Sequence, residues 1–343
     1  MVGAVYDREG VAVKAHAILA VSLLVLATLS GPAAAGRIDR TFHQSFNVSE
    51  GFSLELENGD GDVVITPSGT DVIDVTVRCL ADVKRIGPGG DPDFEVEFES
   101  GADAVGVKGR FTPSGISVFE WIKIHEYVYT IEAPSYVTLE IRGDDGDISI
   151  EDWRAAIDCS SDDGDVLLDG FTGRTASFSF DDGDVTVKRA EGSLEFSGDD
   201  GDVSLSECGH VTVSIALDDG DVSATECGGD VAVSLDDGDV TLDLIETATT
   251  SVDADDGDLK LSIQSGEVER VDLSSDDGNV VVSMPEGGSY SYSISMDDGG
   301  LKLDLPGQQK YDRDEHSVRG EVRGGGAHLS IYTDDGDVVV TGR

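Results

Sequence analysis

Aspartates recur along this chain in a short acidic turn that offers oxygen ligands to a cation. A tetrapeptide of the type Asp-Asp-Gly-Asp returns eleven times, around Gly61, Gly146, Gly164, Gly183, Gly201, Gly220, Gly238, Gly257, Gly278, Gly299 and Gly336. If the turns stack at the inter-strand spacing of ~4.8 Å, equivalent carboxylates repel one another and attract Ca²⁺, which favours several oxygen ligands. We therefore predict calcium ligands in five central turns: Asp163, Asp165, Asp182, Asp184, Asp200, Asp202, Asp219, Asp221, Asp237 and Asp239.

A purely structural role for these aspartates is the alternative. Asp side chains bond to the backbone of tight turns, and glycine supplies backbone conformations that other residues resist. The calcium β-roll repeat G-G-x-G-x-D-x-U-x is not matched, because in residues 198–205 Asp202 stands one place early and Val203 takes the expected Asp position. Both interpretations stay open, and no cofactor other than Ca²⁺ is indicated.

Two of the four cysteines are placed for a disulfide. Cys208 and Cys227 each lie seven residues after a turn glycine, in identical Glu-Cys-Gly sequences 19 residues apart. Stacked neighbours fall within the Cα separation that a disulfide requires, and an exported protein meets oxidising conditions. We predict a Cys208–Cys227 disulfide, with two free buried thiols as the alternative. Cys79 and Cys159 fall on inward strand positions, and their pairing is left open.

Signatures of catalysis are missing from the chain. It has no G-x-S-x-G elbow, no H-E-x-x-H, no P-loop and no C-x-x-C motif. Paired carboxylates are typical of glycosidases, but here they recur in every repeat, whereas a catalytic pair should be a unique break in the pattern. We predict that the protein is not an enzyme, with a polysaccharide lyase or hydrolase of the β-helix type as the alternative.

The spacing of the turns predicts the fold. From Gly146 to Gly299 the steps are 18 to 21 residues, and apolar residues alternate on both sides of each glycine, as in Val185 and Val187 or Phe196 and Leu194. A fixed period with alternation of two indicates stacked coils that bury one strand face against their neighbours. We predict an all-β, right-handed parallel β-solenoid with two short strands per coil and turn glycines at Gly146, Gly164, Gly183, Gly201, Gly220, Gly238, Gly257 and Gly278. Antiparallel hairpins in a sandwich are the alternative.

Two stretches interrupt the period where solenoid ends need covering. Residues 80–134 contain strand-like runs without an acidic turn, and we expect an antiparallel insertion or N-terminal cap there. Residues 306–326 are expected to form an irregular loop before the last coil. The predicted organisation is a signal peptide at 1–35 followed by a single solenoid domain at 36–343.

Charge and the N-terminal segment indicate the compartment and the partners. An apolar run at residues 17–30, followed by small residues, is typical of a secretory signal and too short for a membrane span. The net charge of −47 disfavours nucleic acid and anionic membranes. We expect an exported protein of the periplasm, cell surface or extracellular space, without membrane insertion, whose partner is a protein or glycan at the cell envelope.

Three segments together resemble a known family. They are the NGDGDV run at 58–63, IEAP at 131–134 leading into VTLEIRGDDGDISI, and the ending GGGAHLSIYTDDGDVVVTG. They are similar to the putative-adhesin family of bacterial β-strand-repeat proteins, a domain of unknown function, over residues 45–341. The resemblance implies a β-solenoid in an exported or envelope protein and supplies no catalytic or binding residues.

Overall fold

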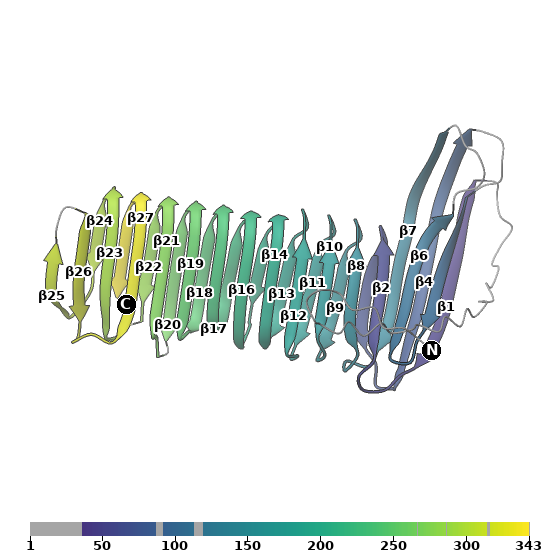
Figure 1. The fold of residues 1–343 in the computed structure, drawn as a ribbon, viewed down its shortest axis with the longest axis horizontal. Helices are drawn as coiled ribbons and strands as arrows, with labels where there is room; N and C mark the ends of the chain where they lie inside the picture. Colours follow the sequence, from purple (N-terminus) through teal and green to yellow (C-terminus); the bar gives the residue numbers. More distant parts are fainter. Residues whose placement is uncertain are drawn as a thin grey trace, which may run out of the picture.

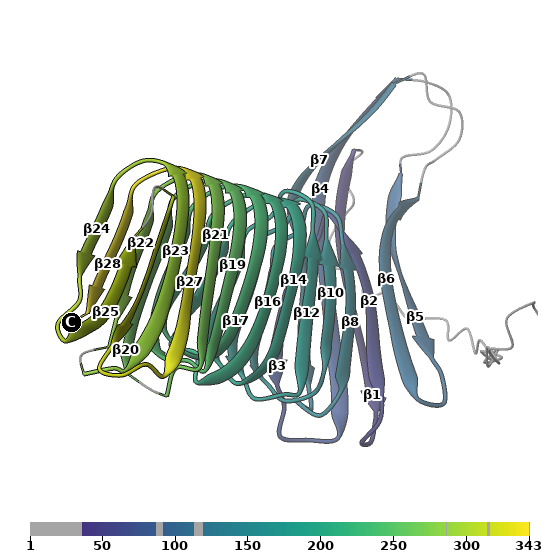
Figure 2. The ribbon, with the colours of Figure 1, turned by 60° about the vertical axis from the view of Figure 1, so that its left-hand side comes forward.

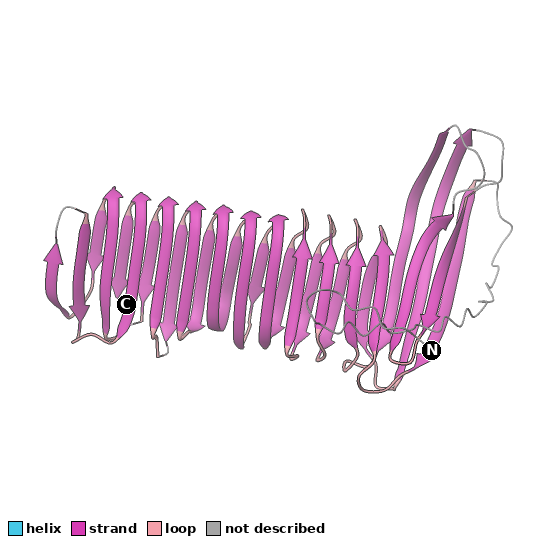
Figure 3. Cartoon of the chain, in the orientation of Figure 1, coloured by secondary structure: helices cyan, strands magenta, loops and turns pink. Residues whose placement is uncertain are grey.

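Strands account for all of the regular structure that is described. The computed structural model describes residues 36–86, 92–112, 119–265, 267–285, 287–313 and 316–342. Within those ranges every regular element is a β-strand (Figure 3), and no helix is long and apolar enough to cross a membrane. The predicted signal peptide at 1–35 lies outside the described residues.

The middle of the molecule is a stack of two-stranded coils (Figure 1). Equivalent strands of successive coils pair in parallel, with Ile157 opposite Ala176 and Val166 opposite Val185. The strands before the acidic turns form the first ladder: β8 (Thr138–Gly143), β10 (Ile157–Ser161), β12 (Thr175–Phe180), β14 (Gly192–Asp200), β16 (His210–Asp219), β19 (Thr249–Asp256) and β21 (Arg270–Asp277). The strands after the turns form the second ladder: β9 (Ile148–Trp153), β11 (Val166–Phe171), β13 (Val185–Ala190), β15 (Val203–Ser206), β18 (Val240–Glu246), β20 (Leu259–Ser265) and β22 (Val280–Met284). β17 (Val222–Asp237) contributes to both ladders.

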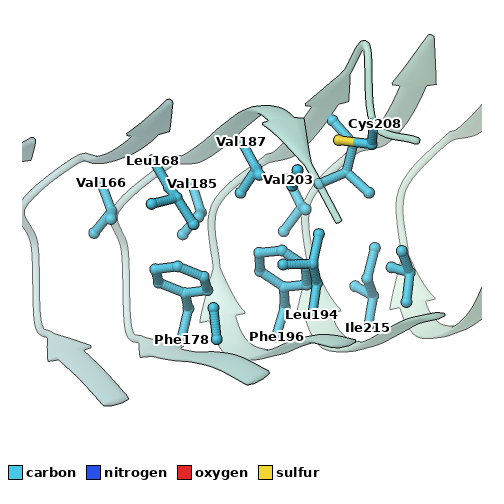
Figure 4. Packing of buried hydrophobic residues seen from close by; sticks show 14 of the residues in the cluster. Val166, Leu168, Phe178, Val185, Val187, Leu194, Phe196, Val203, Cys208 and Ile215 are labelled. Atoms are coloured by element: carbon cyan, nitrogen blue, oxygen red, sulfur yellow. The ribbon is translucent and has the colours of Figure 1, made fainter. Parts of the chain in front are cut away.

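The core is one continuous cluster between the two ladders. Alternate side chains of each strand point inward, and equivalent residues stack from coil to coil, as Phe178 and Phe196 do with ring centroids 5.4 Å apart (Figure 4). Because each coil has only a thin apolar interior, its burial depends on the coils on either side. The parallel, all-β architecture agrees with the sequence; the right-handed sense stays a prediction.

The N-terminal end combines parallel and antiparallel strands. β2 (Ser53–Gly59) and β3 (Asp62–Pro67) form the first acidic coil, and β6 (Ala104–Thr112) and β7 (Phe119–Ala133) pair with them in parallel. Antiparallel strands then cover this layer: β5 (Asp93–Ser100) on β6, and β4 (Val72–Ile86) followed by β1 (Arg37–Asn47) on β7. Between them Phe94 packs on Tyr127 at 4.9 Å between ring centroids, and the Tyr127 and Tyr129 hydroxyls lie 2.6 Å apart.

This arrangement corrects the expected insertion at residues 80–134 in two respects. The covering strands begin at Val72, and β6 and β7 run parallel to the coil below them. Alternation of polar and apolar residues predicts a strand but not the direction of its partner, so the sequence pattern did not distinguish these cases.

The C-terminal end is not built in sequence order (Figure 2). The final strands, β27 (Ala327–Asp335) and β28 (Val338–Gly342), lie between the coil of β21 and β22 and the coil of β23 (Tyr290–Asp298) and β24 (Leu301–Asp304). The last coil of the chain is therefore the penultimate coil of the stack. In β27, Ile331 is buried in the same inward row as Leu273 and Ile294, and Leu329 in the same row as Val271 and Tyr292.

Residues 306–326, expected as an irregular loop, form a cap instead. They contain β25 (Gln308–Arg313) and β26 (Ser317–Val322), which pair antiparallel, and β26 also pairs antiparallel with β23. Val318 and Val322 of β26 are buried against the end of the core. A hairpin at this place satisfies the backbone groups of β23 that would otherwise form an open sheet edge.

Candidate functional site

The acidic turns form one continuous edge of the molecule, which we term the acidic edge (residues 60–62, 144–147, 162–165, 181–184, 199–202, 218–221, 236–239, 255–258, 276–279, 297–300 and 334–337). Its glycines pack directly on one another. A Cβ on Gly164 would overlap the carbonyl oxygen of Gly146, and the same holds for the glycine of every following turn. Gly220 and Gly238 also have positive φ of 132° and 139°. Close backbone approach is thus the common reason for glycine along the edge.

The aspartate after each glycine belongs to a hydrogen-bond ladder that links the coils. Its backbone N–H donates to Oδ1 of the equivalent side chain in the preceding coil, at 2.8–3.2 Å. The accepting residues, in spatial order, are Asp62, Asp147, Asp165, Asp184, Asp202, Asp221, Asp239, Asp258, Asn279 and Asp337. One oxygen of each predicted ligand of this type is therefore already bound to the protein backbone.

Two departures from the motif follow from this ladder. Asn279 replaces the aspartate but keeps an accepting oxygen, and its Oδ1 lies 3.0 Å from the Asp337 nitrogen. Gly300 occupies the same position in the terminal coil, where its N–H donates to Asp337 Oδ1 and no further coil needs an acceptor. The residue types at this position are explained by hydrogen bonding between coils.

The aspartate before each glycine lies in a second row that makes no such ladder. Desolvation, and after it the carboxylates of Asp182 and Asp145 in the neighbouring turns, raise the pKa of Asp163. Desolvation together with Asp200 and Asp237 likewise raises the pKa of Asp219. Stacked like charges disfavour the ionised form, so this row carries electrostatic repulsion that the fold tolerates.

The ten predicted calcium ligands are thus divided between the two rows. Asp165, Asp184, Asp202, Asp221 and Asp239 lie in the ladder, whereas Asp163, Asp182, Asp200, Asp219 and Asp237 lie in the repulsive row. In the part of the chain that the structure describes, no three acidic, histidine or cysteine side chains converge on one point as metal ligands. Calcium binding stays a prediction.

A shallow groove runs beside the N-terminal half of the acidic edge. It lies on the outer face of β3, β9, β11 and β13, and one border is formed by Asp62, Asp147, Asp165 and Asp184. Its floor includes Val64, which is 37% exposed, and Leu167, with Ser149 and Thr186 between and beyond them. The groove places two apolar side chains, Val64 and Leu167, next to a row of carboxylates, and Lys188 also lines it.

The other bend of the coil, the second corner, uses a different device. Here the backbone turns through a single residue with positive φ: Asp152, Gly170, Arg189, Glu207 and Glu226 in successive coils, with φ between 47° and 83°. The following residue points into the core, and the row reads Trp153, Phe171, Ala190, Cys208 and Cys227, all buried. Left-handed backbone is unfavourable for residues other than glycine, so packing of the next side chain stabilises this corner.

Cys208 and Cys227 are neighbours in this inward row. Ser206 and Thr225 are register partners in β15 and β17, and the Gly228 nitrogen donates to the Cys208 carbonyl at 2.9 Å. Both cysteines are free thiols in the structure; their disulfide stays a prediction. Cys159 stacks between Ile141 and Phe178, and Cys79 lies opposite Arg40 and Tyr127.

The acidic edge repeats through residues 144–337, and a comparison with known families identifies the family to which this repeat belongs. A model of the family described as Toastrack DUF4097 matches residues 129–228 and again 194–341. The chain belongs to the Toastrack DUF4097 family. The matched part contains the stacked coils and the C-terminal cap, while β1 to β6 precede it.

One solved structure and the curated proteins complete the comparison of this Toastrack chain. A putative cell adhesion protein from Clostridium sporogenes is 8% identical, with 89% of this chain and 100% of the other covered, at a TM-score of 0.22. This score is too low to support an argument about either fold or function. No curated protein matches.

Four of the described histidines of this Toastrack chain, His43, His125, His210 and His316, pair with acids on the surface. Asp74 accepts from both His43 (2.8 Å) and Ser45 (2.8 Å), and His125 contacts Asp82 at 2.9 Å. In the Ser45–Asp74–His43 group the hydroxyl donates to the carboxylate rather than to the imidazole, so no base activates it. The sequence pattern indicated a second, looser turn in each coil, for example at Glu207-Cys208-Gly209. It did not identify the groove, nor the positive φ of the residue that precedes the inward row at this turn.

Proposed function

We propose that this protein is exported and acts as a non-catalytic, adhesin-like scaffold that presents the acidic edge and the groove to a protein or glycan at the cell envelope. Membership of the Toastrack family and its resemblance to bacterial β-strand-repeat proteins support this role. The carrying observation is the continuity of one surface over many coils. A catalytic site is a local break in a fold, whereas this surface repeats.

The ladder of hydrogen bonds gives the scaffold its rigidity. Each coil is tied to the next by two strand ladders and by the aspartate Oδ1 contact between turns. A surface that is already ordered loses little conformational entropy when a partner binds. Repeated identical contacts also favour extended or multivalent partners.

Charge defines the kind of partner that the edge attracts. Residues 144–305 contain 42 Asp and Glu against seven Lys and Arg. A partner with positive groups spaced along it is therefore attracted, and the attraction weakens as salt screens it. Apolar contact with Val64 and Leu167 in the groove adds a component that salt does not remove.

Site-specific photo-crosslinking on intact cells tests the scaffold role. A photoreactive residue at Leu167, in the groove, should capture a defined envelope partner; the matched position Ser177, on the outer face of β12, should not. The same crosslink should weaken at high salt. Equal capture from both positions, or cleavage of an envelope polysaccharide by the purified chain, would contradict the proposal.

Export has a separate test. The N-terminus of the protein recovered from its source should be Gly36, and the protein should be found outside the cytoplasm. An intact N-terminus on cytoplasmic protein would exclude export.

A further inference from the structure

The pair Cys208 and Cys227 stands apart from the acidic edge and the groove. Each side chain is 1% exposed, in the inward row of the second corner (Figure 4 shows Cys208 in its coil). Each is preceded by a glutamate with left-handed backbone, at φ 53° for Glu207 and 55° for Glu226. The two coils therefore present their thiols with the same backbone geometry, one above the other.

The surroundings make this pair unique among the described cysteines. Each of these two thiols donates to the carbonyl two residues before it, Cys208 to Ser206 and Cys227 to Thr225, both at 3.4 Å. Cys159 has Ile141 and Phe178 as its register neighbours, and Cys79 lies in β4 of the N-terminal cap. Adjacent strands bring equivalent Cα atoms within the separation that a disulfide spans.

Reactivity also separates the pair from the other two thiols. The interaction between the two thiols, the dominant cause, lowers the pKa of one member of the pair, Cys208, and raises the pKa of the other, Cys227. Burial raises the pKa of Cys79 and of Cys159 to about 12. Because the thiolate is the nucleophile in exchange, we expect this pair to react before Cys79 and Cys159.

The two cysteines lie in a stretch of the chain that is rich in carboxylates. Between Ala190 and Leu259 the chain has 20 carboxylates and no Lys or Arg. Both cysteines lie inside this stretch, where no Lys or Arg offsets the repulsion between coils. A covalent link at the opposite corner opposes separation of these coils.

We propose that Cys208 and Cys227 form a redox site whose disulfide staples two adjacent coils at the most acidic part of the solenoid. The oxidant is a disulfide, either of a small thiol or of an exchange protein. One thiol of the pair, taken as Cys208, gives its proton to solvent, and its thiolate attacks one oxidant sulfur and releases a thiolate. That thiolate takes the Cys227 proton, and the Cys227 sulfur then attacks the Cys208 sulfur of the mixed disulfide. The second thiolate is released and takes from solvent the proton that Cys208 gave up. Two electrons and two protons pass to the oxidant. The exchange precedes closure of the coils or uses opening at the register shift between Thr225 and Gly228.

Peptide mapping of the full chain tests for the Cys208–Cys227 disulfide. The chain is refolded in a glutathione redox buffer, alkylated under denaturing conditions and cleaved after glutamate, because trypsin has no site between the two cysteines. Cleavage after Glu207, Glu226 and Glu246 yields peptides 208–226 and 227–246. We expect them linked, about 2 Da lighter than the two thiol peptides together since two hydrogens are lost. Cys79 and Cys159 should be alkylated.

Two variants make the outcome decisive. Cys208→Ala, which copies Ala190 in the same row, should leave Cys227 fully alkylated, whereas Cys159→Ser should keep the link. Oxidation should raise the unfolding midpoint of the wild type and of Cys159→Ser, but not of Cys208→Ala. Complete alkylation of Cys208 and Cys227 in refolded wild type, or a link from either one to Cys79 or Cys159, would overturn the proposal. This test does not depend on the proposed scaffold function.

Discussion

The acidic turn and the second corner both bend the chain within each coil, but they differ in how strictly they restrict the residue type at the bend. At the acidic turn each coil touches the identical residue of the next, through glycine on carbonyl and through aspartate on N–H. At the second corner a single residue with positive φ makes the bend, and Asp152, Gly170, Arg189 and Glu207 all do so. Where equivalent residues of successive coils contact one another, the same residue type must recur in every coil. Where only a backbone conformation is required, the residue type can vary from coil to coil. The second corner is therefore where the row can change to cysteine.

Replacement of a glycine in the stack should have the largest effect. Gly220→Ala places a Cβ against the Gly201 carbonyl at a residue with φ of 132°. We expect a loss of about 2–4 kcal/mol in the free energy of unfolding, measured by denaturant titration. Glu207→Gly at the second corner is the control and should be neutral or stabilising, because glycine relieves left-handed strain. Equal losses at both corners would show that the comparison is wrong.

Removal of one ladder acceptor should have the next largest effect. Asp221→Ala leaves the Asp239 N–H without the oxygen that now lies 2.8 Å away. The expected loss is about 1 kcal/mol, the usual net value of a hydrogen bond. Asp221→Asn keeps the acceptor, as Asn279 does naturally, and should retain wild-type stability. A loss in Asp221→Asn as large as in Asp221→Ala would assign the effect to charge instead.

Acidification should stabilise the acidic edge. The raised pKa values of Asp163, Asp219 and Asp256 mean that the folded state binds protons before the unfolded state does. Stability then increases as pH falls from 7 through the raised values toward the unfolded value of about 3.9. Calorimetry should show a rising Tm over this range, and Asp219→Asn should flatten the rise.

The N-terminal cap should respond in the opposite sense. The Arg40 guanidinium bonds to Asp93, and the pKa of that carboxyl is lowered even though burial alone would raise it. Its stabilising effect is present above the unfolded pKa and is lost as pH falls through the lowered value. A Tm that declines steadily from pH 7 downward would mean that such pairs, rather than the repulsive row, dominate the molecule.

Calcium should have the smallest specific effect. One oxygen of each ladder aspartate already accepts a backbone N–H, so the second oxygen is the one available to a cation. If the predicted sites at Asp163 to Asp239 bind calcium, millimolar Ca²⁺ should raise Tm slightly more than NaCl of equal ionic strength, which acts by screening, and EDTA should reverse the difference. Equal shifts from the two salts would refute the predicted calcium sites.

Sequence reasoning was strongest where the chain repeats. The period placed Gly146 to Gly278 in one row and set Cys208 beside Cys227, because coils of equal length must stack in register. It failed for β6 and β7, whose alternation fits either strand direction. It also failed for residues 306–326, where β25 and β26 carry no repeat signal.

By itself, the sequence determined the parallel stacking of coils, the acidic edge and the inward rows, since these follow from local period and alternation. Only the tertiary structure decided that β27 and β28 insert between the coils of β21 and β23. The inward residues of these strands are apolar in every coil, so the alternation pattern does not distinguish one order of coils from another. The same holds for the aspartates. Their spacing indicated a row of charge, and only the fold showed that one row accepts hydrogen bonds while the other repels itself.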